Sequence, residues 1–363
     1  MEFSPKLNIL CGENAQGKTN LLESIWTCTG CRSFRGTRDR DFIGFDKEKA
    51  EIHIKFSDNV REQEIKFAVM KNNIKEKKVT LNGVRLPLLS RLFGSLKCVI
   101  FTPEDLELSK GSPEKRRLFL DISISQIKPS YISAKIKYDN LLNQRNALLK
   151  DIAFGKSDAS MLDIWDEQLA EVGSYISVLR FYYTEKLNNY AKSFYNRLSA
   201  GKENTELYYN STIFKNSLKS TDYKGELKDI YLKKLKESNN EDIRTGYTQY
   251  GIHRDDIIAK INNLNVREFG SQGQQRSVAL VMKLSQAEIL KDEIGEAPVI
   301  LLDDVLSELD ESRQAFIMNN IDNMQVFVSC CNPSDILKYK SGNVYFIENG
   351  SVKDIIYNSR KDY

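Results

Sequence analysis

Apolar residues recur at helical spacing across a long stretch of the chain that contains no proline, between Pro129 and Pro298. From residue 162 to 194 they stand three or four positions apart, and a shorter run of the same spacing covers residues 134 to 152. Residues 155–158, Gly-Lys-Ser-Asp, separate the two runs and have the composition of a turn. The pattern predicts two long helices. They either fold back on each other as a short antiparallel hairpin or pack separately on a globular core, and the spacing alone favours neither arrangement.

The segments on either side of this region have the patterns of strands. Polar and apolar residues alternate in some of them, and Asn82-Gly83 favours a tight hairpin turn, whereas others are uninterrupted apolar runs typical of strands buried on both faces. The predicted strands cover residues 6–11, 50–56, 64–69, 78–83, 298–303 and 325–329. We therefore predict an α/β protein in which a helical lobe, residues 129–245, separates two α/β halves, residues 1–128 and 246–363.

The first candidate site fits the pattern G-x-x-x-x-G-K-[ST] of a phosphate-binding loop, and it lies between a predicted strand and residues 20–26, whose apolar positions have helical spacing. In such a loop, backbone N–H groups and the helix N-terminus surround the phosphates, Lys18 contacts the β- and γ-phosphates, and the Thr19 hydroxyl binds Mg²⁺. The alternative is a glycine-containing turn with a chance Lys-Thr, which the flanking strand and helix disfavour. The candidate ATP-binding residues are Gly12, Glu13, Asn14, Ala15, Gln16, Gly17, Lys18 and Thr19.

A second candidate site is the pair of acids that ends the apolar strand at residues 299–304. In phosphoryl-transfer sites the first acid holds Mg²⁺, usually through water, and the second orients and deprotonates the attacking water. Asp303 and Asp304 are candidates for these two roles. The alternative is an ordinary strand end with acids facing solvent, which the presence of Lys18 and Thr19 elsewhere in the chain disfavours.

A third candidate site is the stretch FGSQGQQRS at residues 269–277, which precedes apolar residues at helical spacing. A serine followed by glycine at the start of a helix can contact a γ-phosphate through a hydroxyl and a backbone N–H. Ser271 and Gly273 are the candidates for these contacts.

The composition, 41% hydrophobic and 28% charged residues in a chain of 363, is that of an ordinary globular protein. No apolar run approaches the roughly 20 residues that span a membrane, and the first residues do not have the pattern of a signal peptide. We therefore expect a cytoplasmic protein without membrane contact. Cys28-x-x-Cys31 has no second pair at zinc spacing, and with only two histidines in the chain a zinc or histidine-based site is disfavoured.

The net charge of +3 is too small to indicate nucleic-acid binding by itself, so a DNA surface has to come from local clusters. Most such clusters in proteins are solvated surface. The candidates are Arg32, Arg35, Arg38 and Arg40, then Lys71 to Lys78, then Lys110, Lys115, Arg116 and Arg117.

In this order, the motifs resemble those of an ABC-type ATPase head, and the helical insertion between them is similar to the SMC-like subgroup. The closer resemblance is to the RecF family of bacterial recombination mediators, and it spans residues 12 to 310. The stretches that carry it are GENAQGKTNLLES, FTPEDLELSKGSPEKRRLFLD, GIHRDD, FGSQGQQRS and VILLDDVLSELD. It implies an ABC-type ATPase head, a P-loop NTPase fold, split by a helical insertion that forms a second lobe.

The resemblance implies a composite site shared by two copies of the chain. The phosphate loop, Asp303 and Asp304 of one copy would hold ATP and Mg²⁺, and Ser271 and Gly273 of the other would close over the γ-phosphate. ATP would hold the homodimer together, with Asp310 at its seam, and hydrolysis would release it. The implied catalytic residues are Asp304, Lys18 and Ser271.

The resemblance also implies partners and a role. Members of the family bind DNA, at gaps and junctions between single- and double-stranded regions, and help a RecR-type mediator to load recombinase. The implied role is DNA repair and replication-fork maintenance, including induction of the SOS response.

The chain departs from the family's pattern at its start, and from the pattern of ABC proteins in general at the switch histidine and the Q-loop. Family members usually carry two strands and an Asn-Phe-Arg-type segment ahead of the phosphate loop, whereas this chain starts eleven residues before Gly12, so we expect the first strand and a candidate adenine-contacting arginine to be missing. Residues 329–331, Ser-Cys-Cys, stand where ABC proteins have a switch histidine; we expect slow hydrolysis, with Ser329 as a hydrogen-bonding partner of the γ-phosphate. Residues 101–105 stand where a Q-loop would fall and contain no glutamine.

Two other classes use the same phosphate loop. A small-molecule kinase needs an acceptor site and a lid but has no use for the signature at 269–277 or for Ser-Glu-Leu-Asp at 307–310. A transporter-type ATPase needs a membrane partner and usually a switch histidine. Formation of a phosphorylated acceptor, or association with membranes, would favour these alternatives.

Overall fold

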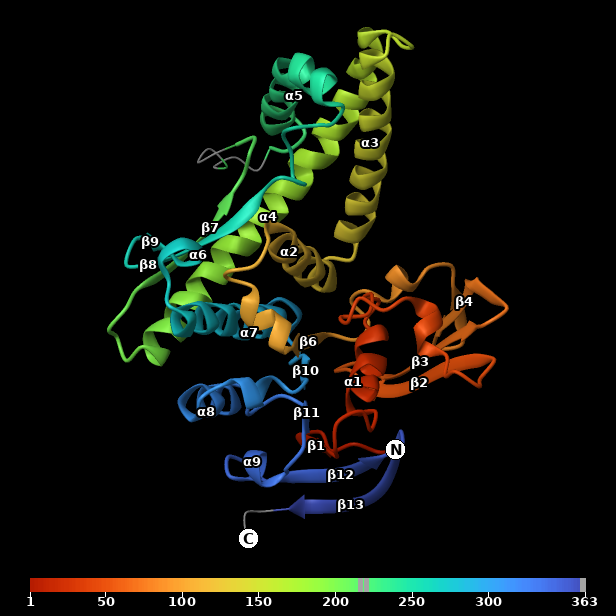
Figure 1. Ribbon diagram of the computed structural model, residues 1–363, viewed down its shortest axis with the longest axis vertical. Helices are drawn as coiled ribbons and strands as arrows, with labels where there is room; N and C mark the ends of the chain where they lie inside the picture. Colours follow the sequence, from red (N-terminus) through yellow and green to blue (C-terminus); the bar gives the residue numbers. More distant parts are fainter. Residues whose placement is uncertain (215–217, 219–221, 360–363) are drawn as a thin grey trace. The chain divides into compact units, whose positions relative to one another are not determined.

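The computed structural model describes residues 1–214, 218 and 222–359, which form two compact units (Figure 1). Unit 1 contains Met1–Leu106 and Leu280–Tyr363, and unit 2 contains Glu107–Ala279. The chain thus begins unit 1, forms unit 2 and returns to unit 1. This is the predicted order of two α/β segments around an insertion.

A six-stranded sheet is the centre of unit 1, with the strand order β13-β12-β1-β11-β10-β6. Its strands are β1 (Leu7–Cys11), β6 (Cys98–Phe101), β10 (Val299–Leu302), β11 (Val326–Cys330), β12 (Gly342–Glu348) and β13 (Ser351–Ser359). Pairing is parallel from β12 through to β6, and β13 pairs antiparallel with β12. The apolar runs predicted as buried strands are confirmed, because β1, β10 and β11 lie inside the sheet with both faces covered. Their carboxyl ends meet at one edge.

A second, antiparallel sheet of unit 1 has the order β2-β3-β4-β5. Its strands are β2 (Lys49–Ser57), β3 (Glu62–Met70), β4 (Asn73–Leu81) and β5 (Val84–Leu86). The strands predicted from alternation are all present. The predicted hairpin turn is also confirmed, since Asn82 and Gly83 join β4 to β5 with positive φ angles of 51° and 80°.

Short helices complete the part of the chain around these sheets. The α-helices are α1 (Lys18–Thr27), α8 (Glu311–Asn320) and α9 (Ser334–Leu337). The 3-10 helices are η1 (Asp39–Phe42), η2 (Leu89–Leu92), η3 (Pro103–Glu107) and η5 (Val305–Glu308).

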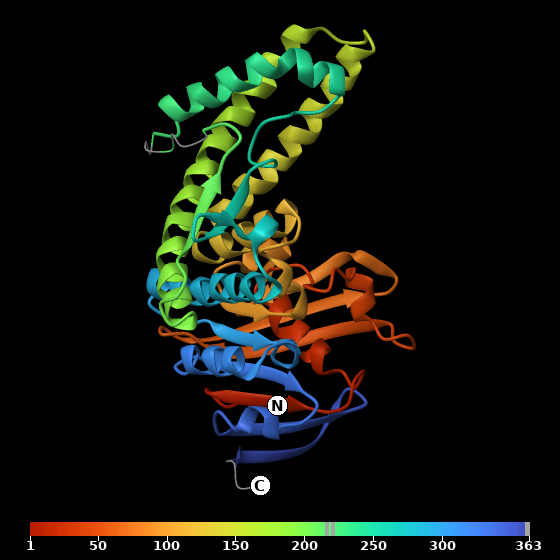
Figure 2. The ribbon, with the colours of Figure 1, turned by 60° about the vertical axis from the view of Figure 1, so that its left-hand side comes forward.

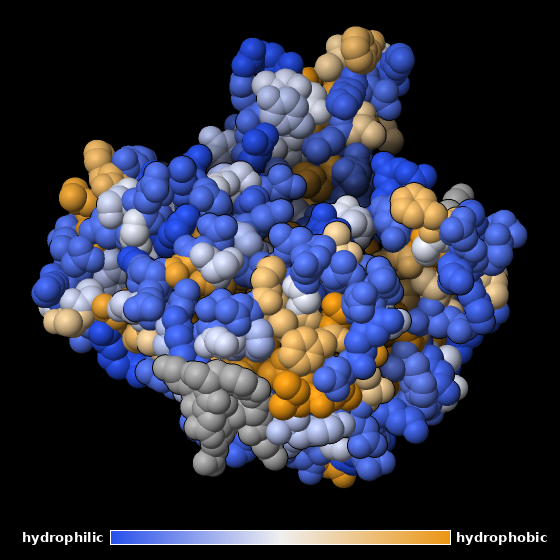
Figure 3. Space-filling model, turned by 60° about the horizontal axis from the view of Figure 1, so that its bottom comes forward, coloured by the Kyte–Doolittle hydropathy of each residue, from blue (hydrophilic) through white to orange (hydrophobic). Residues whose placement is uncertain are grey.

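The edge strand β13 leaves some apolar side chains at the surface, among them Ile356 and Tyr357. Figure 3, which looks toward the β13 side of the molecule, shows mostly hydrophilic side chains, with apolar ones gathered near the lower centre and in smaller groups elsewhere. Exposed apolar side chains of this kind are common on globular proteins and do not by themselves indicate a binding site.

Unit 2 is mainly helical. Its α-helices are α2 (Pro113–Ile127), α3 (Ser130–Ala153), α4 (Leu162–Leu198), α5 (Glu226–Thr245) and α6 (Val266–Phe269), and α7 (Gln272–Ile294) begins in it. A three-stranded sheet, β7 (Thr205–Asn210), β8 (Asp256–Ile261) and β9 (Leu264–Asn265), and the 3-10 helix η4 (Ala159–Met161) complete it. The sequence patterns did not predict this sheet.

The antiparallel helix hairpin is the correct one of the two predicted arrangements. α3 and α4 run back along each other (Figures 1 and 2), and residues 154–161 connect them. Apolar positions of the two helices, among them Leu141, Leu148, Leu162 and Leu169, are buried. The turn contains Gly155 at a φ of 69°, which a glycine adopts without strain.

The helices of unit 2 also bury a network of charged and polar groups. Arg145 on α3 has no exposed surface and contacts carboxylates from two other helices, Asp166 at 2.6 Å and Asp242 at 2.8 Å. Arg180 on α4 is equally buried and donates to the Asp121 carboxylate at 2.7 Å and to the carbonyl of Ile252 at 2.6 Å. A buried arginine is tolerated only with its charge paired and its N–H groups bonded, so these contacts fix how the helices pack.

The unit boundaries differ from the predicted ones at residues 128/129 and 245/246. α2 and residues 246–279, predicted to belong to the two α/β halves, cluster with the helical unit instead. One physical reason is a buried ion pair inside unit 2, in which the Arg116 guanidinium on α2 binds the Asp256 carboxylate of β8 through Nε at 2.7 Å and Nη2 at 2.8 Å.

His253 makes the stability of unit 2 dependent on pH. Its Nδ1 lies 2.9 Å from the Tyr138 hydroxyl and its Nε2 lies 3.0 Å from the carbonyl of Thr248, and burial lowers its pKa from 6.5 to about 4. Because the unfolded chain binds this proton more readily, stability is lost as the pH falls from 6.5 towards 4. Between pH 7 and 4.5 we expect His253→Gln to reduce the acid-induced loss in the free energy of unfolding by about 2 kcal/mol.

The measurement is urea unfolding at both pH values, followed by Trp165 fluorescence in a Trp26→Phe background, because Trp165 lies in unit 2 and the chain has two tryptophans. An equal acid-induced loss in the variant and the parent would contradict the prediction.

Within residues 1–214, 218 and 222–359, no helix is both long enough and apolar enough to cross a membrane.

Candidate functional site

The predicted phosphate loop lies between β1, which ends at Cys11, and α1, which begins at Lys18. Gly17 has a φ of 99°, a conformation that favours glycine. At Gly12 a Cβ atom would lie 2.4 Å from the carbonyl oxygen of Ile347, so only glycine fits there. The strand–loop–helix context expected for this motif is therefore present.

The turn between β12 and β13 holds the loop from the other side. The backbone N–H of Gly350 donates to the Gln16 carbonyl at 2.9 Å, and that of Asn349 donates to the Gln16 Oε1 at 2.6 Å. The sequence patterns did not identify these anchors, because they join residues more than 300 positions apart.

Lys18 is only 4% exposed, and its ammonium group lies within the loop. Its Nζ donates to the carbonyl oxygens of Gly12 at 2.6 Å and Glu13 at 3.1 Å. These two contacts hold the Lys18 ammonium against the backbone of the loop. An anionic phosphate would be a stronger acceptor for the same ammonium than the two carbonyls are.

Thr19 and the acid pair come together at the carboxyl edge of the sheet. The Thr19 hydroxyl donates to the Asp303 carboxylate at 3.0 Å. The Ser329 hydroxyl lies 3.0 Å from Asp303 Oδ1 and 3.1 Å from Asp304 Oδ1, and it accepts the backbone N–H of Asp304 at 2.8 Å. Three separate segments, the start of α1 and the ends of β10 and β11, thus meet at these side chains.

Burial raises the pKa of the Asp303 carboxyl, while the hydrogen bonds from Ser329 and Thr19 oppose this shift. A cation beside the carboxylate would stabilise its charged form. Asp304 has a φ of 49°, in the left-handed region that non-glycine residues adopt rarely. Backbone strain of this kind is often found at functional sites, which fits the role predicted for this residue.

The donor set beside the loop fits Mg²⁺. Mg²⁺ prefers hard oxygen ligands and usually keeps water and substrate phosphate oxygens in its shell, so one carboxylate and one hydroxyl from the protein suffice. Asp303 and Thr19 supply these two groups in contact with each other. Among the described residues no group of three or more His, Cys, Asp or Glu side chains could hold a metal ion, and the thiols of Cys28 and Cys31 are buried with their pKa values raised to about 12.

The predicted signature stretch forms the start of α7. The exposed Ser271 accepts the backbone N–H of Gln274 at 3.2 Å, and the Gln274 side chain accepts the backbone N–H of Ser271 at 2.9 Å. This reciprocal pair is a capping box, which explains the Ser-x-x-Gln spacing in physical terms. Gln274 also donates to Glu203 at 2.7 Å, and Gln275 donates to the carbonyl of Gly270 at 3.0 Å.

Ser271 and Gln272 are exposed, so the N-terminus of this helix of 23 residues lies at the surface. Such an end carries positive partial charge and attracts anions. Ser271 and Gly273 belong to unit 2, whereas residues 12–19, Asp303 and Asp304 belong to unit 1.

The stretch predicted at the Q-loop position follows β6 at the same edge as the acid pair. The backbone N–H of Asp303 donates to the carbonyl of Phe101 at 2.9 Å. Asp105 accepts the backbone N–H of Thr102 at 2.9 Å and pairs with Lys283 at 3.3 Å. The Q-loop glutamine stays without an assigned position.

The first basic cluster is exposed and attached to α1. Arg32, Arg35, Arg38 and Arg40 are all at the surface. The Arg35 guanidinium contacts Asn20 at 2.9 Å and the buried carboxylate of Glu23 at 3.4 Å. Asn20 and Glu23 both belong to α1, the helix that follows the phosphate loop, and Asn20 is next to Thr19. Arg35 therefore connects this cluster to that helix.

The cluster of Lys110, Lys115, Arg116 and Arg117 offers fewer surface charges than predicted. Arg116, expected to face DNA, is 3% exposed and is bound to Asp256, so it cannot also contact a phosphate at the surface. Arg117 is partly buried and donates to the carbonyl of Asp255 at 3.0 Å, whereas Lys115 and Lys110 are exposed. The run from Lys71 to Lys78 falls partly on side chains that lie outside the described set.

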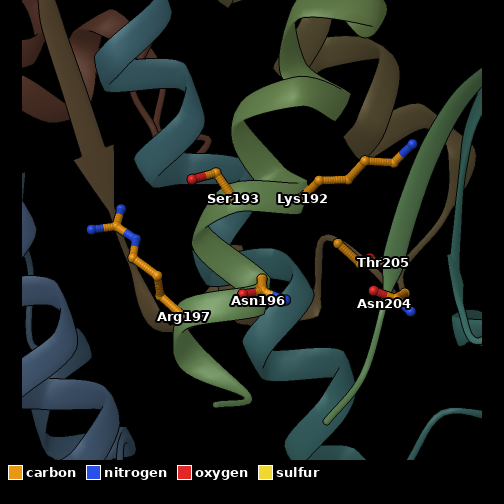
Figure 4. Close-up of a pocket in the computed structure, with 6 residues that line it drawn as sticks. All are labelled: Lys192, Ser193, Asn196, Arg197, Asn204 and Thr205. Atoms are coloured by element: carbon orange, nitrogen blue, oxygen red, sulfur yellow. The ribbon is translucent and has the colours of Figure 1, made fainter. Parts of the chain in front are cut away.

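Unit 2 also contains a hollow of about 520 Å³. It is lined by Lys192, Ser193, Asn196, Arg197, Asn204 and Thr205. Figure 4 shows Lys192 and Arg197 pointing to opposite sides of α4, so their charges do not converge on one ligand. The candidate site therefore remains the phosphate loop with the acid pair.

Comparison with known proteins gives consistent matches over nearly the whole chain. The RecF/RecN/SMC N terminal domain family matches residues 1–351. The DNA replication and repair protein RecF of Alkaliphilus oremlandii is 37% identical over 354 residues, which cover 97% of this chain and 95% of that protein. The protein of the same name from Lachnospira eligens is 42% identical over 335 residues, 91% of this chain and 87% of that protein.

Two solved structures are similar to the whole chain. The structure of the recombination mediator protein RecF-ATPrS in the RecFOR pathway has a TM-score of 0.89 and 35% identity, covering 97% of this chain and 93% of that one. That of RecF-ATP in the same pathway has a TM-score of 0.87 and 36% identity, covering 98% and 93%.

These similarities confirm the predicted fold class, an α/β ATPase head of the ABC type that a helical insertion interrupts. They also confirm the resemblance on which the predicted roles depend. The chain belongs to the RecF family, within the wider group of RecF, RecN and SMC proteins.

Proposed function

We propose that this chain is an ATP-dependent DNA-binding protein of DNA replication and repair, in which ATP and Mg²⁺ join two copies and slow hydrolysis releases them. Its relatives carry the name DNA replication and repair protein RecF, and the similar solved structures are of RecF with ATP and with ATPrS. The observation that carries the proposal is the hydrogen bond of 3.0 Å between Thr19 and Asp303, because it joins the phosphate loop to the acid pair.

Each polar group of the site has a proposed task. Lys18 donates to phosphate oxygens in place of the two loop carbonyls that it contacts now. Thr19 and Asp303 hold Mg²⁺, which when bound neutralises charge on the phosphates. Asp304 orients the attacking water and accepts its proton. Ser329, placed between both acids, is the proposed partner of the γ-phosphate at the position of a switch histidine.

The second copy supplies the signature. Ser271 is exposed, and although its oxygen accepts the Gln274 N–H, its hydroxyl can still donate to a phosphate of another molecule. Gly273 leaves room for close approach of a phosphate to the helix N-terminus. In a two-fold arrangement the same surface pair occurs twice, so both ATP molecules are enclosed at once, with Asp310 at the seam.

The decisive variant is Ser271→Arg. We expect it to bind ATP like the parent but to stay monomeric with a non-hydrolysable ATP analogue and Mg²⁺, because a bulky cation replaces the small hydroxyl at the proposed interface. Sedimentation velocity measures the oligomeric state, and nucleotide titration measures the affinity.

The matched control is Ser160→Arg, which adds the same side chain at an exposed serine elsewhere in unit 2. It should dimerise like the parent. Normal dimerisation of the Ser271→Arg variant would show that the site is not shared between copies.

The proposed DNA-contacting groups are the exposed cluster of Arg32, Arg35, Arg38 and Arg40 in unit 1 and, as a separate cluster in unit 2, the exposed Lys110 and Lys115 with the partly buried Arg117. The contact between Arg35 and Glu23 of α1 gives a direct route by which nucleotide bound at the start of α1 affects the cluster in unit 1. The partners that we propose for this chain are DNA with gaps or junctions and a RecR-type mediator. The proposed role includes a part in the SOS response.

We expect Arg32→Ala combined with Arg38→Ala to make the salt dependence of duplex DNA binding shallower by about 2 in the slope of log K against log salt, since each phosphate contact contributes about 0.9. Fluorescence anisotropy at salt concentrations from about 50 to about 200 mM measures this slope. Lys353→Ala, an exposed lysine on β13, is the matched control and should leave the slope unchanged. The same slope in the double variant and the parent would identify the cluster as ordinary solvated surface.

A further inference from the structure

Three cysteines lie together at the base of the phosphate loop. Cys11 is the last residue of β1 and Cys330 the last residue of β11, and the two are direct neighbours in the parallel pairing of these strands. The Cys11 thiol donates to the carbonyl of Cys331 at 3.3 Å. Cys331 is the next residue after Cys330. Its thiol lies 3.5 Å from Asn14 Oδ1 and 3.8 Å from the Lys18 ammonium. The Cys331 thiol therefore contacts two residues of the loop proposed to bind phosphate, and the Cys11 thiol contacts the backbone of Cys331.

The position of Cys11 and Cys330 suits a disulfide. Neighbouring strands lie about 4.8 Å apart, and the Cα atoms of disulfide-bonded cysteines are usually about 4.4 to 6.8 Å apart. The two side chains extend from adjacent parallel strands in register, and so on the same face of the sheet. Cys330 is partly exposed, which gives a small oxidant access to the pair.

The pair also differs from the other cysteines in reactivity. The hydrogen bond with Cys330 and the charge of Lys18 lower the pKa of the Cys11 thiol to about 7, against the opposing effect of burial, and the same hydrogen bond with burial raises the pKa of Cys330. Burial instead raises the pKa of Cys28 and Cys31 to about 12. Since the thiolate is the reactive form, Cys11 is the sulfur that an oxidant attacks first at neutral pH.

We propose that Cys11 and Cys330 are a modification site at which hydrogen peroxide forms a disulfide that weakens nucleotide binding by the phosphate loop. The Cys11 thiolate attacks one peroxide oxygen and becomes a sulfenic acid, and the other oxygen leaves as water after taking up a proton. The Cys330 thiol then attacks this sulfur, the S–S bond forms and a second water leaves. Two thiols are oxidised and one peroxide is reduced to two waters; a dithiol reverses the change.

The disulfide acts on the loop through its first residue. The backbone N–H of Gly12 donates to the carbonyl of Cys330 at 3.3 Å, and the Gly12 carbonyl accepts from Lys18 at 2.6 Å. Gly12 is also packed so closely against Ile347 that not even a Cβ fits. A covalent bond holds the two sulfurs about 2 Å apart and fixes the ends of β1 and β11 against each other. With no free space around Gly12, any backbone adjustment that this requires passes into the loop and to Lys18.

The test compares ATP binding by the full chain before and after treatment with hydrogen peroxide. We expect about tenfold weaker binding of a fluorescent ATP analogue after oxidation, equal to about 1.4 kcal/mol, and recovery with dithiothreitol. Peptide mass spectrometry without reduction should find Cys11 joined to Cys330. Cys330→Ser should keep its affinity after peroxide. Cys28→Ser, the matched control with a buried thiol outside the pair, should remain as sensitive as the parent.

The inference rests on the proposed ATP site, and the experiment separates the two. If the reduced protein does not bind ATP, the proposed function is wrong, whereas the mass-spectrometric arm still decides whether the thiol pair forms a disulfide. If no Cys11–Cys330 peptide forms, or if Cys330→Ser loses affinity after peroxide as the parent does, the thiol pair is not the modification site. Sensitivity that disappears in Cys331→Ser alone would assign the effect to the exposed thiol beside Lys18 and overturn the proposal.

Discussion

Replacing Lys18 with alanine is expected to weaken ATP binding about 100-fold, which corresponds to about 2.7 kcal/mol. The Lys18 ammonium is almost fully buried inside the loop and donates hydrogen bonds to the carbonyls of Gly12 and Glu13. Its removal leaves the phosphates without their principal cation in a place that water reaches poorly, where loss of one partner of a charge pair costs the most. Isothermal titration with ATP and Mg²⁺ measures the change.

Lys6→Ala is the matched control, because Lys6 lies just before β1 with an exposed side chain in the same unit. It should bind ATP like the parent, and both variants should unfold at the temperature of the parent within the error of the measurement. An Lys18→Ala variant that is folded and retains the affinity of the parent would remove the phosphate loop from the proposed function.

Replacing Arg145 with leucine is expected to lower the free energy of unfolding of unit 2 by about 3 to 5 kcal/mol. The guanidinium pairs with the buried carboxylates of Asp166 and Asp242 and also donates to the buried Thr248 at 2.7 Å and the partly buried Asn239 at 2.8 Å. Leucine fills part of the volume but leaves two buried carboxylates without their cation. Urea unfolding followed by Trp165 fluorescence in the Trp26→Phe background reports on this unit.

The control is Arg244→Ala on α5, whose guanidinium is exposed and pairs with Glu241 one turn away. It should unfold at the same urea concentration as the parent. A second comparison adds Asp242→Leu to Arg145→Leu, which should recover part of the loss because one unpaired carboxylate is removed. A small effect of Arg145→Leu alone would show that water or a rearranged side chain satisfies the carboxylates.

The local parts of the site could be predicted from the sequence because each depends on neighbouring residues. Gly12 and Gly17 mark a turn that only glycine tolerates, and the alternation of apolar residues identifies the strand before it. The capping box at Ser271 is likewise a matter of residues three positions apart. The helix hairpin of α3 and α4 was one of two predicted arrangements, and packing of its apolar stripes decided between them.

The sequence alone could not predict which charged residues are buried. Arg116 was expected at a DNA surface because it stands between Lys115 and Arg117, yet its position on α2 directs it at Asp256, 140 residues later. Arg145 belongs to the apolar stripe of α3, but the stripe does not reveal that carboxylates from α4 and α5 neutralise it. These contacts also explain why α2 and residues 246–279 belong to unit 2 rather than to the predicted halves.

By itself, the sequence determined the phosphate loop, the strands that flank it and the long helices, because turns, strand alternation and helical spacing are set by residues close together in the chain. The tertiary structure alone decided that Thr19 meets Asp303, 284 positions away, that Ser329 stands between the two acids, and that Cys11 lies beside Cys330. The physical reason is the order of the strands: β1, β11 and β10 are neighbours in one parallel sheet, and strand order follows from packing of the whole unit rather than from any local pattern.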